Sequence, residues 1–430
     1  MPVSDRGCDH AEPHAPSFWP DVTDLRGHAV VSLLRDGDIR RVWAVGLFAG
    51  VGRWLEMLVA GIYAFDVTGS PMLVALLILL RMAPFALFGP LVGALADRLP
   101  PRLLLAVGLS CVSAVSGTVL MFFLLEIDAY WVVALACFVA GLIWCSDMPL
   151  RRRLLGDIAG SDRLAAVMGI DSATGNGTRM LGPLIGGGLY AWLGAGGAFG
   201  LAAVLFATSA LLIAGLRRPA DNPVATAAAQ GLLRQMREAL QLALRDREIL
   251  AILSVTVIFN IWGFPFVSMI PVIGADELTL TPELIGVLAS LEGAGALTGA
   301  LTIAFLARPL AFRWLYVGGT ACYMIMAFVV GSLGSAVPVA LAIFCVGLAG
   351  ACFGTMQSTL IYATAPDGMR GRMFGLIVLA IGTGLIGFAN IGLMGELFGA
   401  STAVRIVAAE GLIPLVIVAV LWARYRRATG

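Results

Sequence analysis

Five charged side chains lie deep inside apolar stretches of this sequence, where an ionised group is costly. They are Arg53, Glu56, Arg81, Arg179 and Glu292. An ionised side chain in the middle of a bilayer costs about 2.5–3.5 kcal/mol even on a lenient insertion scale. Counted along their helices, all five fall at or just outside one midplane layer, with Arg53 and Glu56 ~16–21 Å deep at ~1.5 Å per residue. Such a layer predicts a site for polar groups between helices.

Glu56 and Glu292 are the candidate proton carriers in this layer. Burial and a neighbouring arginine act on a carboxylate in opposite directions, so trading an arginine contact for a substrate or a proton can couple two fluxes. Arg53 and Glu56 are three residues apart on one helix face, where they can pair with each other. Asn260 adds a candidate hydrogen-bonding wall. The alternative is a set of static ion pairs that only hold helices together.

Long apolar runs must position these side chains. The chain has 430 residues, of which 59% are hydrophobic and 13% charged. Because soluble domains are about 45–50% apolar and about 25% charged, an ordinary water-soluble enzyme is excluded. Twelve runs each approach the ~20 residues that cross a bilayer: 42–66, 72–96, 103–125, 131–149, 165–192, 198–216, 249–273, 284–306, 314–333, 336–360, 373–395 and 403–423. They must be helices, since open strands would leave backbone groups unpaired in lipid, so we predict an all-α integral membrane protein.

The arginines predict the orientation of these helices. All 28 basic residues are arginine, and the absence of lysine excludes a Walker-type ATP site. The arginines that flank the runs lie at alternate ends only, in the segments 40–41, 98–102, 151–163, 217–247, 308–313, 370–372 and 424–427. Positive charge collects on the cytoplasmic side, so both termini are predicted to be cytoplasmic.

The runs divide six and six around a long basic segment. We predict a polar cytoplasmic tail at 1–38, a six-helix bundle at 39–216, a cytoplasmic linker at 217–248, a second bundle at 249–424 and a tail at 425–430. Short basic loops after the fourth and tenth runs echo each other, as in transporters built from two repeats. The linker pattern predicts an amphipathic helix on the membrane surface, either a passive tether or a regulatory element.

Residues 93–102, between the second and third runs, read GALADRLPPR. The segment resembles motif A of the major facilitator superfamily, G-x-L-a-D-r-x-g-r-[KR], in the place where that family carries it. The matching positions are Gly93, Asp97, Arg98 and Arg102. Pro100 and Pro101 replace the usual Gly and Arg, which removes one cationic contact but still favours a tight turn. The resemblance implies two pseudo-symmetric six-helix bundles.

Asp97 lies where the second run reaches the cytoplasm, and the eleventh run begins on the same face near Phe374. A carboxylate beside a helix N-terminus gains roughly 0.3–1 kcal/mol. Arg98, or Arg151 and Arg152 after the fourth run, can pair with the same carboxylate. These positions predict a gating latch that joins the two halves at the inner face. The alternative is that Asp97 and Arg98 only cap a loop.

The fifth run ends in GPLIGG at residues 182–187, which resembles the core of motif C, associated with exporters of the superfamily. The matching positions are Gly182, Pro183, Gly186 and Gly187. Small residues let helices approach closely, so they predict either a tight contact with the eighth run or a bending point. The eighth run offers the small stripe Gly293, Gly295 and Gly299.

Four further stretches, 52–57, 146–155, 179–183 and 370–375, resemble the enterobactin-exporter-like and macrolide-efflux-like branch of the same family. The likeness extends over about residues 39–424. It implies proton-coupled efflux of a small amphiphilic molecule, drug-like or siderophore-like, by alternating access. The alternatives are a lysolipid or nutrient carrier, and a membrane receptor or scaffold that has kept the fold but transports nothing.

Several other classes of site do not fit the sequence. Residues 382–387 match G-x-G-x-x-G but lie inside an apolar helix with no preceding strand, so a dinucleotide site is rejected. The histidines, His10, His14 and His28, all lie in the tail with Cys8, where a metal site is the alternative to a mobile tail. We predict no enzyme, no cofactor and no metal. The predicted partners are a small-molecule substrate, protons and the lipid bilayer, without nucleic acid, for a monomer in the bacterial inner membrane.

Overall fold

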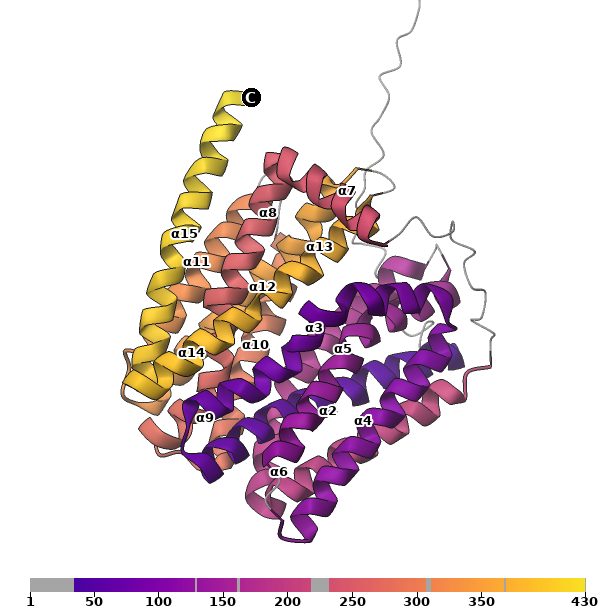
Figure 1. The fold of residues 1–430 in the computed structure, drawn as a ribbon, viewed down its shortest axis with the longest axis vertical. Coiled ribbons are helices and arrows are strands. Elements are labelled where there is room, and N and C mark those ends of the chain that lie inside the picture. Colours follow the sequence, from indigo (N-terminus) through magenta and orange to yellow (C-terminus); the bar gives the residue numbers. More distant parts are fainter. Residues whose placement is uncertain are drawn as a thin grey trace, which may run out of the picture.

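A computed structural model describes residues 35–127, 130–160, 163–217, 232–306, 311–366 and 369–429, and every regular element in these ranges is a helix (Figure 1). The first half holds α2 (Gly37–Thr68), α3 (Pro71–Arg98), α4 (Pro101–Leu124), α5 (Tyr130–Ala159) and α6 (Leu164–Ala214). The second half holds α8 (Arg247–Ile258), η3 (Phe259–Gly263), η4 (Phe264–Met269), α9 (Ile270–Val272), η5 (Ile273–Glu277), α10 (Pro282–Leu306), α11 (Phe312–Val330), α12 (Ala336–Thr364), α13 (Arg370–Gly382), α14 (Gly384–Phe398) and α15 (Ala400–Thr429). Helix α7 (Leu232–Arg245) lies between the halves in sequence.

Eleven segments of the described chain are long and apolar enough to cross a membrane. The longest, Ala166–Ala214 in α6, has 49 residues and would measure ~74 Å at ~1.5 Å per residue, too long for one ~30 Å crossing. Gly194 breaks it, because its φ of 66° and ψ of −174° are not helical. The two parts of α6 therefore correspond to the fifth and sixth predicted runs. The prediction of an all-α membrane protein with twelve spans is confirmed over the described residues.

The two halves form two packed groups of helices, indigo to pink and red-orange to yellow in Figure 1. In the first group α2 packs on α6, and α3 and α4 pack on α5; in the second, α12 packs on α10 and α11. The groups meet chiefly through α6 with α10 and through α3 with α14 and α13. The end of the molecule that carries α7 and the basic loops is called the arginine-rich end below, and the other is called the opposite end.

Glycines bring the halves together from mid-depth to the opposite end. A Cβ on Gly187 of α6 would lie 2.7 Å from the Cα of Gly286 of α10, and a Cβ on Gly395 of α14 would lie 2.9 Å from Pro71 of α3. Side chains at these glycines would push the helices apart. In Figure 1, α14 runs beside α3 near the α9 end.

The seventh span is irregular where it lines the interface. Between α8 and α10 the chain forms a π-helix, a 3₁₀ turn and a second π-helix, η3, η4 and η5, with Pro265 and Pro271 inside this stretch. Proline removes a backbone donor and clashes with the preceding turn, which explains the break in regular hydrogen bonding. Irregular helices at membrane depth are tolerated where they border a cavity. This stretch supplies three side chains to the pocket described below.

The amphipathic linker helix exists as α7, within the predicted segment. Ala239 and Ala243 on one face are buried, whereas Leu240 and Leu244 on the other are exposed. Glu238 forms an ion pair with Arg372 of α13 at 3.0 Å, so α7 is joined to the second half. Residues 1–34 and 218–231 lie outside the described residues, and with them lie nearly all of the predicted tail and the start of the predicted linker.

Candidate functional site

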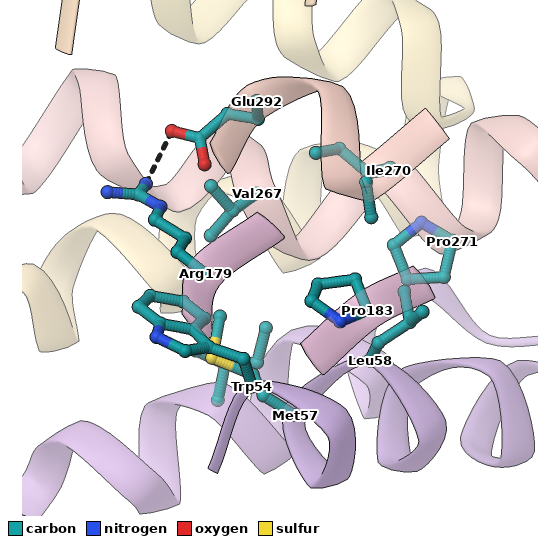
Figure 2. A pocket seen from close by; sticks show the side chains of 11 residues that line it. Trp54, Met57, Leu58, Arg179, Pro183, Val267, Ile270, Pro271 and Glu292 are labelled. Carbon is teal, nitrogen blue, oxygen red and sulfur yellow. Dashed lines mark hydrogen bonds and ion pairs between the residues drawn. The ribbon is translucent and has the colours of Figure 1, made fainter. Parts of the chain in front are cut away.

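A pocket lies between the two halves and is lined almost entirely by apolar side chains (Figure 2). It encloses about 450 Å³ of empty space, including its open mouth. The first half contributes Trp54, Met57 and Leu58 from α2, Ile78 from α3, and Arg179 and Pro183 from α6. The second half contributes Val267, Ile270 and Pro271 from the irregular span, and Ala289 and Glu292 from α10. A mostly apolar wall with a few polar groups is typical of sites for small organic molecules.

The pocket wall contains one ion pair, and that pair joins the two halves. The Nη2 atom of Arg179 on α6 donates to the Oε1 atom of Glu292 on α10. Glu292 is only 4% exposed. The two helices touch beside it, because a Cβ on Gly293 would lie 2.5 Å from the backbone nitrogen of Met180. Separation of α6 from α10 would break this ion pair.

Arg179 has a second partner in the pocket. Its guanidinium carbon lies 5.0 Å from the centroid of the Trp54 ring, a cation–π contact worth about 0.5–2 kcal/mol depending on desolvation. Figure 2 shows the Arg179 side chain between the Trp54 ring and Glu292. Its Nε atom has no hydrogen-bond partner among the described residues. Arg179 therefore fills the place that a ligand cation would occupy between an aromatic face and a carboxylate.

Trp54 connects the pocket to the predicted residue Arg53. The Trp54 ring packs edge-on against Trp144 of α5, with 6.0 Å between centroids. The guanidinium carbon of Arg53 lies over Trp144, 5.0 Å from the ring centroid. Arg53 Nη2 also donates to Asp147 Oδ2 at 2.7 Å. Arg53 therefore does not line the pocket itself, and the rings of Trp144 and Trp54 lie between it and the pocket.

Glu56 and Arg81 lie inside the first half and do not line the pocket. Arg81 Nη2 is 3.4 Å from Glu56 Oε2, and the hydroxyl of Ser116 donates to Glu56 Oε1. All three residues are at most 4% exposed. The expectation that Arg53 pairs with Glu56 is wrong, because Glu56 binds Arg81 of α3 and Arg53 binds Asp147 of α5. Both Arg53 and Glu56 are therefore paired with residues of neighbouring helices and not with each other.

The predicted latch residues are only partly described. The backbones of Gly93, Asp97 and Arg98 belong to the last turns of α3, and their side chains lie outside the described residues. Arg102 donates to the carbonyl oxygen of Ala214, where it caps the C-terminus of α6 within the first half. Arg151 also pairs within the first half.

Arg151 belongs to an ion cluster at the arginine-rich end. Asp171 of α6 accepts from Arg151 Nη1 and from Arg152 Nε, the latter at 3.0 Å. Arg151 Nε lies 4.0 Å from Asp147 Oδ1, which extends the cluster toward Arg53. All these residues come from α2, α5 and α6, so the described part of the cluster fixes the first half internally.

The small residues of the fifth span divide between two neighbours. Gly182 and Gly186 face α2, where Cβ atoms would lie 2.5 Å from Trp54 and 3.2 Å from Leu55. Gly187 and the carbonyl of Pro183 face Gly286 of α10.

The predicted glycine stripe on the eighth span is correct only in part. Gly293 packs on α6, as noted above, but Gly295 and Gly299 pack on α12 against Phe344 and Leu348. The expectation that both face the fifth span is wrong because residues two and six positions further along a helix point in other directions.

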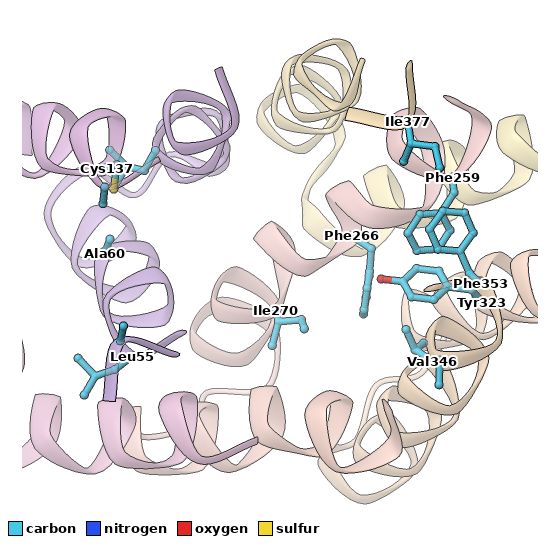
Figure 3. Packing of buried hydrophobic residues seen from close by; sticks show 14 of the residues in the cluster. Leu55, Ala60, Cys137, Phe259, Phe266, Ile270, Tyr323, Val346, Phe353 and Ile377 are labelled. Atoms are coloured by element: carbon cyan, nitrogen blue, oxygen red, sulfur yellow. The ribbon is translucent and has the colours of Figure 1, made fainter. Parts of the chain in front are cut away.

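Asn260 does not reach the pocket either. Its Nδ2 atom donates to the carbonyl of Thr256 at 2.9 Å, one turn earlier in the same span. Beyond it the second half holds an aromatic cluster, in which Phe259 stacks on Phe353 with 3.7 Å between centroids (Figure 3). Tyr323 packs edge-on against Phe259, is fully buried, and has no partner for its hydroxyl among the described residues.

Sequence reasoning missed Trp54, Trp144 and Tyr323. A signal for Trp54 was present, because tryptophans in membrane proteins gather at the interfaces, whereas this one lies at mid-depth between Arg53 and Glu56. Its depth could have marked it as a pocket residue. Tyr323 gives no such signal, since only the packed structure shows that its hydroxyl is unpaired.

Comparison with known proteins agrees with this architecture. The family model described as Major Facilitator Superfamily matches residues 42–389. The chain belongs to the Major Facilitator Superfamily. It is 25% identical over 374 residues to the MFS-type transporter YfiS of Bacillus subtilis (strain 168), covering 83% of this chain and 86% of the relative. It is 22% identical over 243 residues to Macrolide efflux protein A of Streptococcus pyogenes, covering 56% and 60%.

Solved structures of Major Facilitator Superfamily transporters share the fold at low identity. A bacterial homologue of the human lysosomal transporter Spinster, inward-facing and unoccupied, superimposes with a TM-score of 0.70 at 15% identity, over 90% of this chain and 96% of that one. The nucleoside transporter NupG superimposes with a TM-score of 0.67 at 14% identity, over 90% and 99%. The protein is therefore a multi-pass membrane transporter of this superfamily.

Proposed function

We propose that the protein is a proton-coupled exporter of a small amphiphilic molecule, which works by alternating access around the pocket between its halves. The observation that carries this proposal is the Arg179–Glu292 ion pair, which is the only charged pair among the described residues that line the pocket. An apolar wall suits the apolar part of an amphiphile, and an ion pair whose members can bind the ligand in place of each other suits its polar part. The similarity to macrolide efflux proteins supports efflux rather than uptake.

Glu292 is the proposed proton carrier. A carboxylate that loses Arg179 in a buried setting is left as an uncompensated charge, which favours its protonation or its binding of a substrate cation. Breakage of the pair on one side of the cycle and its return on the other side would then exchange a proton for cargo. Inward movement of one proton through 100 mV supplies ~2.3 kcal/mol for that exchange.

The orientation follows from charge. The arginine-rich end is the proposed cytoplasmic side of a bacterial inner membrane, with both chain termini there. The glycine contacts that join the halves run from mid-depth to the opposite end, which supports closure toward the outside. We propose that the transporter is a monomer, since each chain has its own pocket.

Flux measurements test the proposal. The purified protein is placed in liposomes with an acidic lumen, and uptake of radiolabelled erythromycin, uridine, dialanine and a lysophospholipid is compared with and without a protonophore. We expect the macrolide to accumulate above its external concentration only while the pH gradient lasts, accompanied by proton efflux from the lumen.

Three results would contradict the proposal. Movement of the lysophospholipid without any gradient would indicate a lipid carrier, and gradient-driven uptake of uridine or dialanine alone would indicate a nutrient carrier. A folded protein that moves none of the four, nor any compound missing from the culture medium of a deletion strain, would be a receptor or scaffold.

A further inference from the structure

Glu396 near the end of α14 belongs to the second half but caps a helix of the first half. Its Oε2 atom accepts from the hydroxyl of Ser70 at 2.6 Å and from the backbone N–H of Met72 at 3.4 Å. Ser70 is the residue before α3, and its own hydroxyl oxygen accepts from the N–H of Leu73 at 3.2 Å. The first turn of α3 is thus capped by Ser70 from its own chain segment and by Glu396 from the other half.

This arrangement resembles a capping box, except that the acidic residue comes from the other half of the molecule. In a capping box the N-cap Ser or Thr is followed three positions later by Glu or Gln, whose side chain accepts from the N-cap backbone N–H. Here that position is Leu73, whose side chain cannot accept a hydrogen bond, and the Ser70 N–H donates to Thr68 Oγ1 at 3.2 Å. Glu396 supplies a carboxylate that accepts from the Met72 N–H and the Ser70 hydroxyl, and its charge also faces the positive end of the α3 dipole.

The capping contact lies where the two halves are pressed together. Next to Glu396, Gly395 packs on Pro71 and Gly392 packs on Met72 and Ala75, so at these two positions no side chain of α14 keeps it from α3. Separation of the halves at the opposite end would remove both bonds of Glu396 at once. Closure at the opposite end would restore both of them together.

We propose that Glu396 is a latch that holds the opposite end closed by capping α3 across the interface between the halves. The proposal rests on the alternating access proposed above. The helices α13 and α14 belong to one membrane-spanning segment, Gly371–Phe398. The sequence predicts the converse contact at the other ends of the same two spans, with Asp97 at the end of α3 beside the start of α13. A carboxylate on one helix would then cap the other helix at each end, and the transporter would make one contact in each of its two states.

Accessibility of the pocket tests the latch without any substrate or gradient. Ala289 lines the pocket from α10, so an Ala289→Cys variant reports its accessibility. The rate of its reaction with a membrane-impermeant maleimide is measured from the outside of intact cells, after subtraction of the labelling of the parent chain. Loss of a helix cap costs about 1 kcal/mol, so we expect Glu396→Ala to raise this rate roughly five-fold.

The chain provides a matched control for the chemistry. Glu277 accepts from the backbone N–H of Ser401 at 2.8 Å and from its hydroxyl, so it caps α15 from within the same half. Glu277 and Glu396 are both exposed. Glu277→Ala removes a cap at the same end without touching the interface, and it should leave the labelling rate unchanged. Glu396→Gln keeps an acceptor oxygen but loses the charge, and should give an intermediate rate.

Two results would overturn the latch. One is an unchanged labelling rate in Glu396→Ala, and the other is an equal rise in Glu277→Ala, which would reflect general loosening. Because the assay requires no cargo, failure of the latch can be separated from failure of the proposed export. An active proton-driven exporter with an unchanged Glu396→Ala labelling rate would disprove only the latch.

Discussion

The two halves of the molecule hold their buried polar groups in different ways. Within the described residues, the first half closes its buried charges into internal ion pairs, Arg81 with Glu56, Arg53 with Asp147, and Arg151 with Asp171. The second half uses neutral groups, in which Gln357 donates to Thr256 at 3.1 Å and Thr256 bonds to Tyr316 at 2.9 Å. Its one buried charged side chain in the described part, Glu292, takes its partner from the other half.

This difference indicates where a transport cycle can act on charge. Ion pairs inside one half move with that half as a rigid body, so they need not break when the halves rock. In the proposed cycle, an ion pair between the halves breaks when the helices that carry it separate, and it forms again when they return. The charged layer that the sequence predicts therefore divides into a structural part in the first half and a candidate coupling part at Arg179 and Glu292.

The largest effect should follow from breaking an internal pair. Arg81→Leu leaves Glu56 buried without its partner, and loss of one member of a buried pair costs about 3–5 kcal/mol. We expect a loss of monodisperse protein in detergent and a much lower melting temperature. The double variant Arg81→Leu with Glu56→Leu removes both charges and should recover most of the stability, while Ser116 keeps its bond to the Val112 carbonyl. A stable single variant that only failed to transport would place this pair in the cycle instead.

The next effect separates the two glutamates. Glu292→Gln can still accept from Arg179 but cannot carry a proton, so we expect uphill accumulation to fall by roughly 5–150-fold, the usual range for coupling between two ligands. Exchange of labelled for unlabelled substrate, without a gradient, should persist. The matched change Glu56→Gln should keep coupling and alter only thermal stability. Equal loss of coupling in both variants would restore the single layer that the sequence predicts.

A smaller effect on substrate binding is expected from Trp54, which lines the pocket, than from the charged residues, and none is expected from Trp144 behind it. Trp54 faces Arg179 in the pocket and Trp144 faces Arg53 behind it. Trp54→Leu removes a cation–π contact of about 0.5–2 kcal/mol, so the substrate concentration for half-maximal flux should change several-fold while the maximal flux is retained. Trp144→Leu should leave that concentration unchanged. A shift of the same size in Trp144→Leu would mean that the ligand also contacts Arg53.

The fold was open to prediction because membrane insertion leaves few choices. Runs of ~20 apolar residues must be helices, and arginines at alternate ends fix their order across the membrane. The break at Gly194 falls in the gap that the sequence leaves between its fifth and sixth runs. The irregular seventh span could not be read from hydropathy, since a π-helix or 3₁₀ turn is as apolar as an α-helix.

The partners of the charged residues were harder to predict than their depth. Sequence spacing brings Arg53 and Glu56 within reach, but the rotation of each helix against its neighbours decides which groups meet. The same limit applies to Gly295 and Gly299, which face α12. Only Arg179 and Glu292 of the predicted layer line the pocket, because α6 and α10 turn those faces toward each other.

The smallest effect, and the most specific, concerns two tyrosines on α11. Tyr316 and Tyr323 are both fully buried. The Tyr316 hydroxyl donates to the Ile252 carbonyl at 3.1 Å, whereas the Tyr323 hydroxyl has no partner in the described chain. Tyr316→Phe should lower stability by about 1 kcal/mol, and Tyr323→Phe should leave it unchanged or raise it by about 1 kcal/mol. Thermal melting in one detergent compares the two variants directly.

The transport rate should be reduced more in Tyr323→Phe than in Tyr316→Phe, which is the reverse of their order in stability loss. A Cβ on Gly350 would lie 3.3 Å from the Tyr323 ring and 4.0 Å from Glu292 Oε1, so the hydroxyl that has no partner in the described chain belongs to a ring beside Glu292, the proposed proton carrier. We expect it to donate to Glu292 when Arg179 withdraws, which would make Tyr323→Phe slower by a few-fold and change its pH profile. Tyr316→Phe should keep the parent profile. If Tyr323→Phe transports like the parent at every pH, the hydroxyl has no part in the cycle and the coupling rests on Arg179 and Glu292 alone.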